Sequence, residues 1–184
     1  MKKISIFLFL LLLLTSCWKS FELNQKNIDD TYKTPDRSIN LSNKWIKSFV
    51  DLNTYISEKE VNNIYLNDNN IQTINVSWYN KLWRLDISNN DIRFISDLKL
   101  PITIRHLNLS HNNLTNLKWL EKYTKLKTLD ISYNNLEESG IVVKWLKNLK
   151  YINVEWNKVN DELISKLNQF NSVYLSNNKK PFSK

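Results

Sequence analysis

The feature that most constrains the fold is an eleven-residue motif that occurs six times along the chain. One copy is "LKTLDISYNNL", and the six copies begin near residues 61, 82, 104, 126, 149 and 170. Successive copies start 21 to 23 residues apart. A nearly constant period in this range indicates a solenoid, in which each copy forms one coil.

The copies share apolar residues at motif positions 1, 4, 6 and 11. Of the 24 such slots, 23 are apolar, with Lys180 in the last copy as the exception, so composition alone does not explain the match. Positions 4 and 6 alternate as on a short strand, and both side chains therefore point to one side. A single copy cannot bury its apolar face, so the copies must stack and share a core.

Position 9 of the motif is asparagine in all six copies. A side-chain amide offers donors and an acceptor, which suits the buried backbone groups inside the turn that follows each strand. We therefore expect a column of asparagines that links successive coils, formed by Asn69, Asn90, Asn112, Asn134, Asn157 and Asn178.

The pattern L-x-x-L-x-L-x-x-N-x-L resembles that of bacterial leucine-rich repeat proteins, and the 22-residue period is similar to the internalin class. The resemblance covers residues 61–178. It implies an α/β solenoid with six short parallel strands on a concave face and a habit of binding other proteins. Apolar residues at almost every third position in "LTNLKWLEKYTKLKTL" favour 3₁₀ or irregular turns on the convex side.

The N-terminus predicts export. Two lysines precede an apolar run at residues 4–14, which as a helix would cover about half of a bilayer core, as in a signal peptide. The following "LTSC" resembles a bacterial lipobox, which implies removal of residues 1–16 and attachment of lipid, palmitate included, at Cys17. The alternative is an ordinary secretory peptide with an incidental cysteine.

Trp18 stands where an aspartate would favour retention at the inner membrane, so we expect the outer membrane or the cell surface. Removal of the leader lowers the net charge from +8 to +6, which favours acidic surfaces. Cys17 is the only cysteine, so the exported domain has no disulfide and depends on its core.

The remaining segments divide the chain further. Residues 17–41 are expected to be the lipidated N-terminus and a tether, residues 42–60 an N-terminal cap, and residues 61–184 the repeat domain. Trp45, Phe49, Leu52 and Ile56 have helical spacing after a possible N-cap at Ser42, which predicts an amphipathic helix as the cap. Alternatively, "SINLSNK" at residues 38–44 is a degenerate extra repeat.

Residues between the buried motif positions line the concave face in columns. Aromatic residues gather there in the last three repeats, and such residues are enriched in binding hot spots. The candidate ligand-binding residues are Tyr65, Arg84, Asp86, His106, Asp130, Tyr133, Tyr151, Trp156 and Tyr174. The motif register places Tyr174 beside Asn153. We expect a protein partner, with a glycan ligand or a purely structural envelope role as the alternatives.

Residues outside the concave columns have simpler interpretations. We expect the tryptophans at positions 78, 83, 119 and 145 to pack against the core from the convex or flanking side. Lysines 122, 144 and 166 recur at intervals of 22 residues and form either a basic stripe or, as we expect, a solvated edge.

Enzymatic classes find little support in the sequence. Gly140 is the only glycine, which argues against glycine-rich phosphate loops. His106 and His111 lie up to about 16 Å apart along a strand and turn, too far to share a metal. Asp86 and Asp130 would lie about 10 Å apart, with no enclosing pocket in view. We therefore expect no catalysis, no cofactor, no metal and no nucleic-acid partner.

Overall fold

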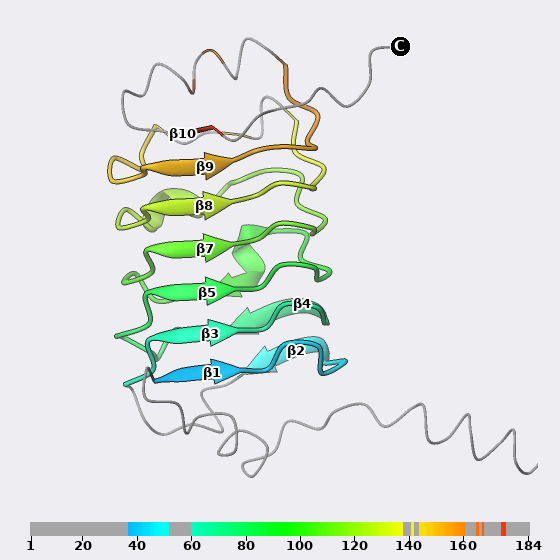
Figure 1. The fold of residues 1–184 in the computed structure, drawn as a ribbon, viewed down its shortest axis with the longest axis vertical. Coiled ribbons are helices and arrows are strands. Elements are labelled where there is room, and N and C mark those ends of the chain that lie inside the picture. The colour runs from blue at the N-terminus through cyan, green and yellow to red at the C-terminus, as the bar shows by residue number, and fades with distance from the viewer. Residues whose placement is uncertain are drawn as a thin grey trace, which may run out of the picture.

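The computed structural model describes residues 37–51, 60–137, 141, 144–160, 165, 167 and 174–175. Cys17, the leader, most of the predicted tether, residues 52–59, Lys166 and Asn178 lie outside this part. The described chain winds into a stack of coils, each of which contributes one strand to a long parallel sheet (Figure 1). The predicted solenoid of parallel strands is confirmed.

The long sheet has seven strands in the order β1-β3-β5-β7-β8-β9-β10. Adjacent strands pair in register, so that position 4 of one motif lies beside position 4 of the next from β1 to β9. The strands are β1 (Ser38–Asn40), β3 (Asn63–Tyr65), β5 (Arg84–Asp86), β7 (His106–Asn108), β8 (Thr128–Asp130), β9 (Tyr151–Asn153) and β10 (Tyr174–Leu175).

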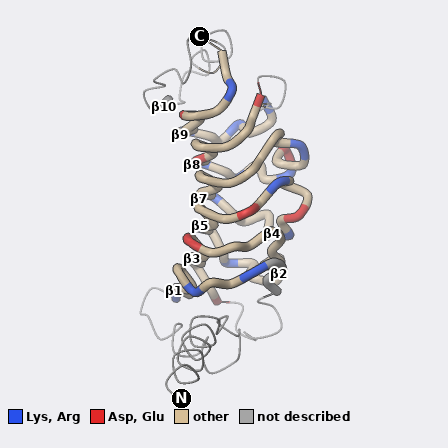
Figure 2. Tube along the Cα trace, turned by 90° about the vertical axis from the view of Figure 1, so that its right-hand side faces the viewer, with Lys and Arg blue, Asp and Glu red and all other residues tan. Residues whose placement is uncertain are grey.

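A second parallel sheet covers the opposite side of the first coils. It contains β2 (Lys47–Asp51), β4 (Asn70–Asn75) and β6 (Leu98–Lys99). The middle coils carry the 3₁₀ segments η2 (Ile95–Asp97) and η3 (Leu120–Lys122). Figure 2, seen from the side on which the strands end, shows the coils running from the long sheet around to β2 and β4. The predicted 3₁₀ turns are thus present in the middle coils, whereas the convex strands were not predicted.

The predicted helical cap is wrong over residues 42–51. Residues 38–51 instead form an additional coil, with Ile39 and Leu41 buried at motif positions 4 and 6. Residues 38–41, which were assigned to the tether, belong to this coil, and the alternative of a degenerate repeat at 38–44 is correct.

Hydrogen bonding explains the extra coil. The edge of β3 would otherwise present free backbone groups, and β1 satisfies them, for example through Leu41 N–H to the Tyr65 carbonyl at 2.8 Å. Asn69 Oδ1 accepts bonds from the N–H groups of Lys44 and Ile46, both at 3.0 Å. These bonds hold residues 44–46 in a turn instead of a helix.

The last strand also departs from the predicted register. In β10, Tyr174 pairs with Tyr151 and Leu175 with Ile152. The predicted register placed Tyr174 beside Asn153, so the observed strand is offset from it by two residues. Within the described chain β10 has a single neighbouring strand to fix its register. A two-residue slip keeps the alternation of faces, so the sequence pattern alone does not resist it.

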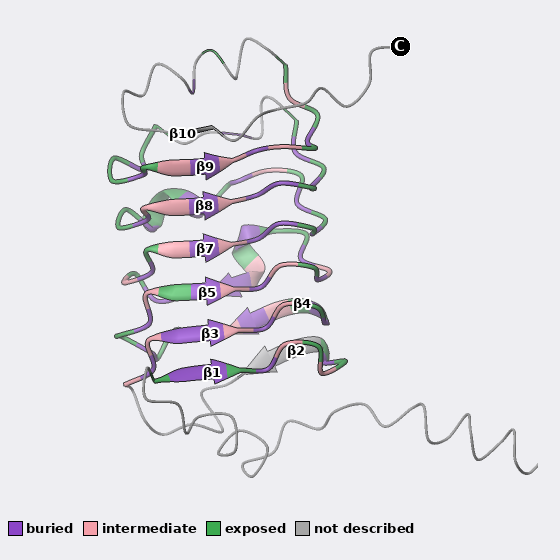
Figure 3. Cartoon of the chain, viewed as in Figure 1, coloured by how far each residue is buried: buried purple, intermediate pink, exposed green. Residues whose placement is uncertain are grey.

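The core consists of apolar columns that run from the coil of β1 to the coil of β9. Each residue of the two strand columns is at most 2% exposed, and Figure 3 shows buried positions within the strands and exposed loops at the left edge of the stack. Tyr123 fills the convex side, where its hydroxyl donates to the Leu98 carbonyl at 3.2 Å. The two columns are Ile39, Ile64, Leu85, Leu107, Leu129 and Ile152, and Leu41, Leu66, Ile87, Leu109, Ile131 and Val154.

The asparagine column bridges each coil to the one before it. Asn112 Nδ2 donates to the carbonyls of Ile87, at 3.0 Å, and Leu109, at 3.2 Å. Its Oδ1 accepts the N–H of Ile92 at 2.9 Å. The same three kinds of bond occur at Asn69, Asn90, Asn134 and Asn157.

Replacing Asn112 with alanine should lower the free energy of unfolding by about 2–4 kcal/mol, because buried carbonyls and the Ile92 N–H lose their partner. Urea unfolding followed by far-UV circular dichroism measures this loss. The neighbouring Asn113 is exposed, so Asn113→Ala is a matched control that should cost no more than about 0.5 kcal/mol. Equal effects of the two substitutions would contradict a bridging role.

Candidate binding face of the long sheet

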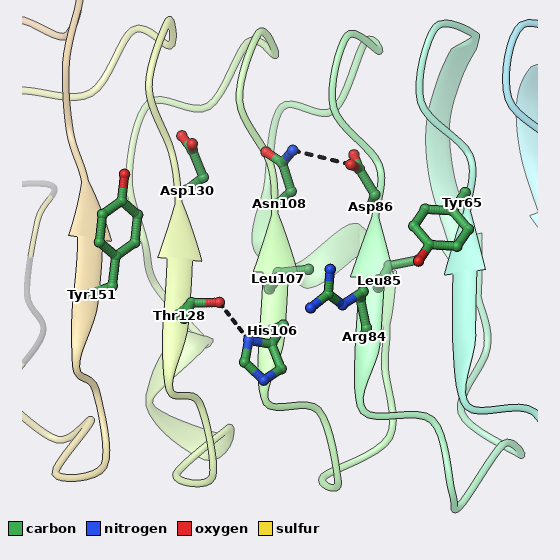
Figure 4. A pocket seen from close by; sticks show the side chains of 10 residues that line it. All are labelled: Tyr65, Arg84, Leu85, Asp86, His106, Leu107, Asn108, Thr128, Asp130 and Tyr151. Carbon is green, nitrogen blue, oxygen red and sulfur yellow. Dashed lines mark hydrogen bonds between the residues drawn. The ribbon is translucent and has the colours of Figure 1, made fainter. Parts of the chain in front are cut away.

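Six of the predicted binding residues line one hollow on the outer face of the long sheet. The hollow has a volume of about 190 Å³ and extends from β3 to β9 (Figure 4). Apart from Leu85 and Leu107, which are at the buried position 4, its residues occupy the motif positions on either side of position 4, which place side chains on the outer face. The lining comprises Tyr65, Arg84, Leu85, Asp86, His106, Leu107, Asn108, Thr128, Asp130 and Tyr151.

Aspartate and asparagine alternate along one row of this hollow. Asn108 donates to Asp86 Oδ2 and Asn153 donates to Asp130 Oδ2, each at 3.2 Å. The amides separate the two carboxylates, which would repel each other on adjacent strands. The second oxygen of Asp86 accepts the backbone N–H and hydroxyl of Ser88, and Asp130 binds Ser132 in the same way. Both carboxylates are thus held in place by the sheet.

Basic and aromatic side chains form the other row, where the strands begin. His106 Nδ1 lies 2.8 Å from the Thr128 hydroxyl, and the edge of its ring meets Trp83 with 5.3 Å between ring centroids. Burial, followed by the nearby charge of Arg84, lowers the pKa of His106 from its ordinary value of 6.5. The lowered pKa favours the neutral imidazole, which offers a hydrogen bond instead of a charge.

A separate feature, which we call the aromatic ledge, consists of His111, Tyr133 and Trp156 at the ends of β7, β8 and β9. The rings of His111 and Tyr133 stack with centroids 4.1 Å apart and planes 10° apart. Tyr133 stacks in turn on Trp156 at 5.3 Å and 19°. Tyr133 and Trp156 remain 41% and 43% exposed, so the stack is open to solvent.

The ledge residues adopt a backbone conformation that disfavours bulky side chains. His111, Tyr133 and Trp156 have φ values of 52°, 53° and 55°, in the left-handed region. The equivalent positions of the earlier coils carry Asn43, Asp68 and Asn89, residue types that tolerate this region better than tyrosine or tryptophan. The coils of β8 and β9 therefore place large aromatic rings where a short polar residue would cost less.

Eight of the nine predicted site residues thus divide between the hollow, with six, and the ledge, with Tyr133 and Trp156, and Tyr174 belongs to neither. The backbone of Tyr174 lies beside that of Tyr151. His111 was not among the residues predicted from the sequence. It occupies the same motif position as Tyr133 and Trp156, and this shared position could have identified it.

The expectation that the convex tryptophans pack in the core is wrong for three of the four. Trp78, Trp119 and Trp145 are 64%, 58% and 53% exposed, and Trp83 is half-buried. In each of the three exposed cases the next residue is the buried one: Tyr79, Leu120 or Leu146. In a tight turn, one of two neighbouring side chains points into the core and the other points to solvent. In these three turns the tryptophan is the side chain that points to solvent.

The described residues include no metal-binding cluster and no membrane-spanning helix. No group of three or more histidine, cysteine, aspartate or glutamate side chains among those residues could hold a metal ion. None of the helices in the same part is long and apolar enough to span a membrane.

Comparison with known proteins agrees with this architecture. A family model described as leucine-rich repeats (2 copies) matches residues 102–139. The fold is that of a leucine-rich repeat solenoid. Solved structures, an internalin among them, share this fold, and no curated protein matches the sequence.

Two leucine-rich repeat structures are similar in fold. An internalin from Listeria monocytogenes is 22% identical with a TM-score of 0.53, and the match covers 65% of this chain and 36% of the internalin. A leucine-rich repeat protein from Leptospira interrogans is 23% identical with a TM-score of 0.52, covering 64% of this chain and 31% of that protein. The matched part of this chain therefore corresponds to about a third of either structure.

Proposed function

We propose that this leucine-rich repeat protein is an exported, lipid-anchored protein whose long sheet binds another protein. The aromatic ledge is the observation that carries the proposal. Exposed aromatic rings at positions that penalise them have no evident value to the fold, whereas stiff aromatic surfaces supply much of the energy of protein–protein binding.

The setting of the ledge supports this function. Leucine-rich repeat folds commonly mediate protein–protein interactions, and here the stacked coils hold the three rings in one fixed array. The hollow beside the ledge has hydrogen-bonded polar side chains. Little conformational entropy would therefore be lost when a partner binds, which favours affinity.

The two carboxylates of the hollow favour a binding role over a catalytic one. Asp86 and Asp130 each accept hydrogen bonds at both oxygens from neighbours on the sheet. A general acid or base needs a proton-transfer position directed at a substrate. We therefore propose no enzymatic activity.

A glycan is the second candidate ligand. The row of Asp86, Asn108, Asp130 and Asn153 offers carboxylate and amide groups on the same face as the aromatic ledge. Such groups can form hydrogen bonds to sugar hydroxyls. Binding on a glycan array that disappears in Trp156→Ala would replace the protein partner with a sugar.

Replacing Tyr133 and Trp156 together with alanine should weaken partner binding at least about tenfold, because hot-spot aromatics contribute about 2 kcal/mol each. Partners are first captured by cross-linking on intact cells and identified by mass spectrometry, and their affinity for the purified variant is then measured by calorimetry. Phe94→Ala with Trp78→Ala is the matched control, since Phe94 and Trp78 are exposed elsewhere. Unchanged affinity in the ledge variant would contradict the proposed binding face.

The lipid anchor is tested at Cys17. Metabolic labelling with a palmitate analogue should mark the wild-type chain, and Cys17→Ser should abolish the label because serine lacks the thiol that receives the lipid. Ser16→Ala is the matched control, since it keeps a small residue before the cysteine and should keep the label. Labelling that persists in Cys17→Ser would exclude this anchor.

A further inference from the structure

The positive charge of the chain is concentrated in two return segments, residues 115–127 and 144–150, which we call the Trp-Lys flank. The two segments contain seven lysines and one acidic residue, Glu121, so their net charge is +6, compared with +8 for the whole chain. Six of the lysines are exposed and Lys127 is half-buried. The lysines are Lys118, Lys122, Lys125, Lys127, Lys144, Lys147 and Lys150.

The two segments lie side by side and form one surface. Asn148 Nδ2 donates to the Thr124 carbonyl at 2.8 Å, and Lys150 N–H donates to the Lys127 carbonyl at 2.8 Å. In Figure 1 the loops that lead into β8 and β9 follow each other at the left edge of the stack, and Figure 3 shows them exposed. Like charges are therefore held close together, which is unfavourable without a partner of opposite charge.

Two exposed tryptophans lie among these lysines. Trp119 is 58% and Trp145 53% exposed. Lys144 Nζ lies 4.9 Å from the centre of the Trp145 ring. Trp119 also has a φ of 75°, in the left-handed region that a bulky side chain disfavours. The flank therefore combines apolar rings with long basic side chains.

This combination is suited to the surface of a lipid bilayer. Indole rings favour the depth of the lipid headgroups, and lysine extends its charge towards the phosphate layer while its methylene stem covers apolar surface. Clustered lysines are attracted to anionic headgroups. A soluble acidic protein would also neutralise the positive charge, but it would not explain as well why two exposed indole rings lie among the lysines.

We propose that the Trp-Lys flank docks on an anionic lipid bilayer. The two flank segments lead into the starts of β8 and β9, whereas the three ledge residues follow the ends of β7, β8 and β9. Docking would therefore leave the ledge open to a partner. The proposal does not depend on protein binding by the ledge, and a tether from the N-terminus to the same membrane would raise the local concentration of the flank at its surface.

The test reconstitutes the full chain into vesicles of phosphatidylcholine, with or without phosphatidylglycerol. Because we expect the apolar N-terminus to insert in both, the measurement is the rate at which each lysine is acetylated, read by mass spectrometry. In anionic vesicles the flank lysines should react at least about threefold more slowly than in neutral ones, with this protection lost near 1 M salt, where the Debye length falls to about 3 Å.

Matched variants separate docking from a general effect of charge. Lys122→Glu with Lys147→Glu should abolish the protection of the remaining flank lysines. Lys99→Glu with Lys158→Glu makes the same change in net charge at exposed positions outside the flank and should leave it intact. Trp119→Ala with Trp145→Ala keeps the charge and should reduce the protection, which a purely ionic contact would not do.

Two results would overturn the proposal. One is equal acetylation of the flank lysines in neutral and anionic vesicles. The other is protection by a soluble anionic polymer, dextran sulfate, without protection by anionic vesicles, which would assign the flank to a soluble acidic partner. Both results are independent of whether Tyr133 and Trp156 bind a protein.

Discussion

The structure depends on how the backbone turns sharply after each strand without leaving buried polar groups unpaired. The turn encloses carbonyl and N–H groups that water cannot reach, and each unpaired group would cost about 1–3 kcal/mol. In each coil from β3 to β9, the amide of one asparagine satisfies groups of its own coil and of the preceding coil. The same bonds fix the vertical spacing of the coils, and the apolar columns and the outer rows follow from that spacing.

This register organises the outer face as well as the core. Because equivalent motif positions lie side by side, each outer position becomes a column whose chemistry can change from coil to coil. The left-handed position runs from Asn43, Asp68 and Asn89 to the aromatic ledge. One backbone geometry thus carries a polar column in the early coils and an aromatic one in the later coils.

Much of this arrangement could be predicted from the sequence, because period and side-chain type determine it. The strands, the buried columns and the asparagine slots follow from the spacing of the motif. The first coil was not recognised as a repeat because Lys44 occupies the position of the motif asparagine. In addition, the spacing of Trp45 and Phe49 also fits a helix. The hydrogen bonds of Asn69 decide between these two structures, and such contacts over more than 20 residues are not visible in a local pattern.

The sequence predicts which face of the sheet the candidate-site residues occupy, but not which of their side chains touch one another. The outer face of Asp86, His106 and Tyr151 follows from strand alternation, whereas the stacking of His111 on Tyr133 depends on side-chain conformations that spacing does not determine. The exposure of Trp119 and Trp145 was mispredicted because residue type suggested burial, while the turn directs Leu120 and Leu146 inwards instead.

Native-state hydrogen exchange tests the asparagine-linked stack most directly. The N–H groups of Ile71, Ile92, Leu114 and Leu136 lie just after the turns and donate to asparagine side chains. They should exchange as slowly as the amides of the buried strands, and together with them as one cooperative unit. Exchange at the rate of exposed loops, while the strand amides remain protected, would contradict the account.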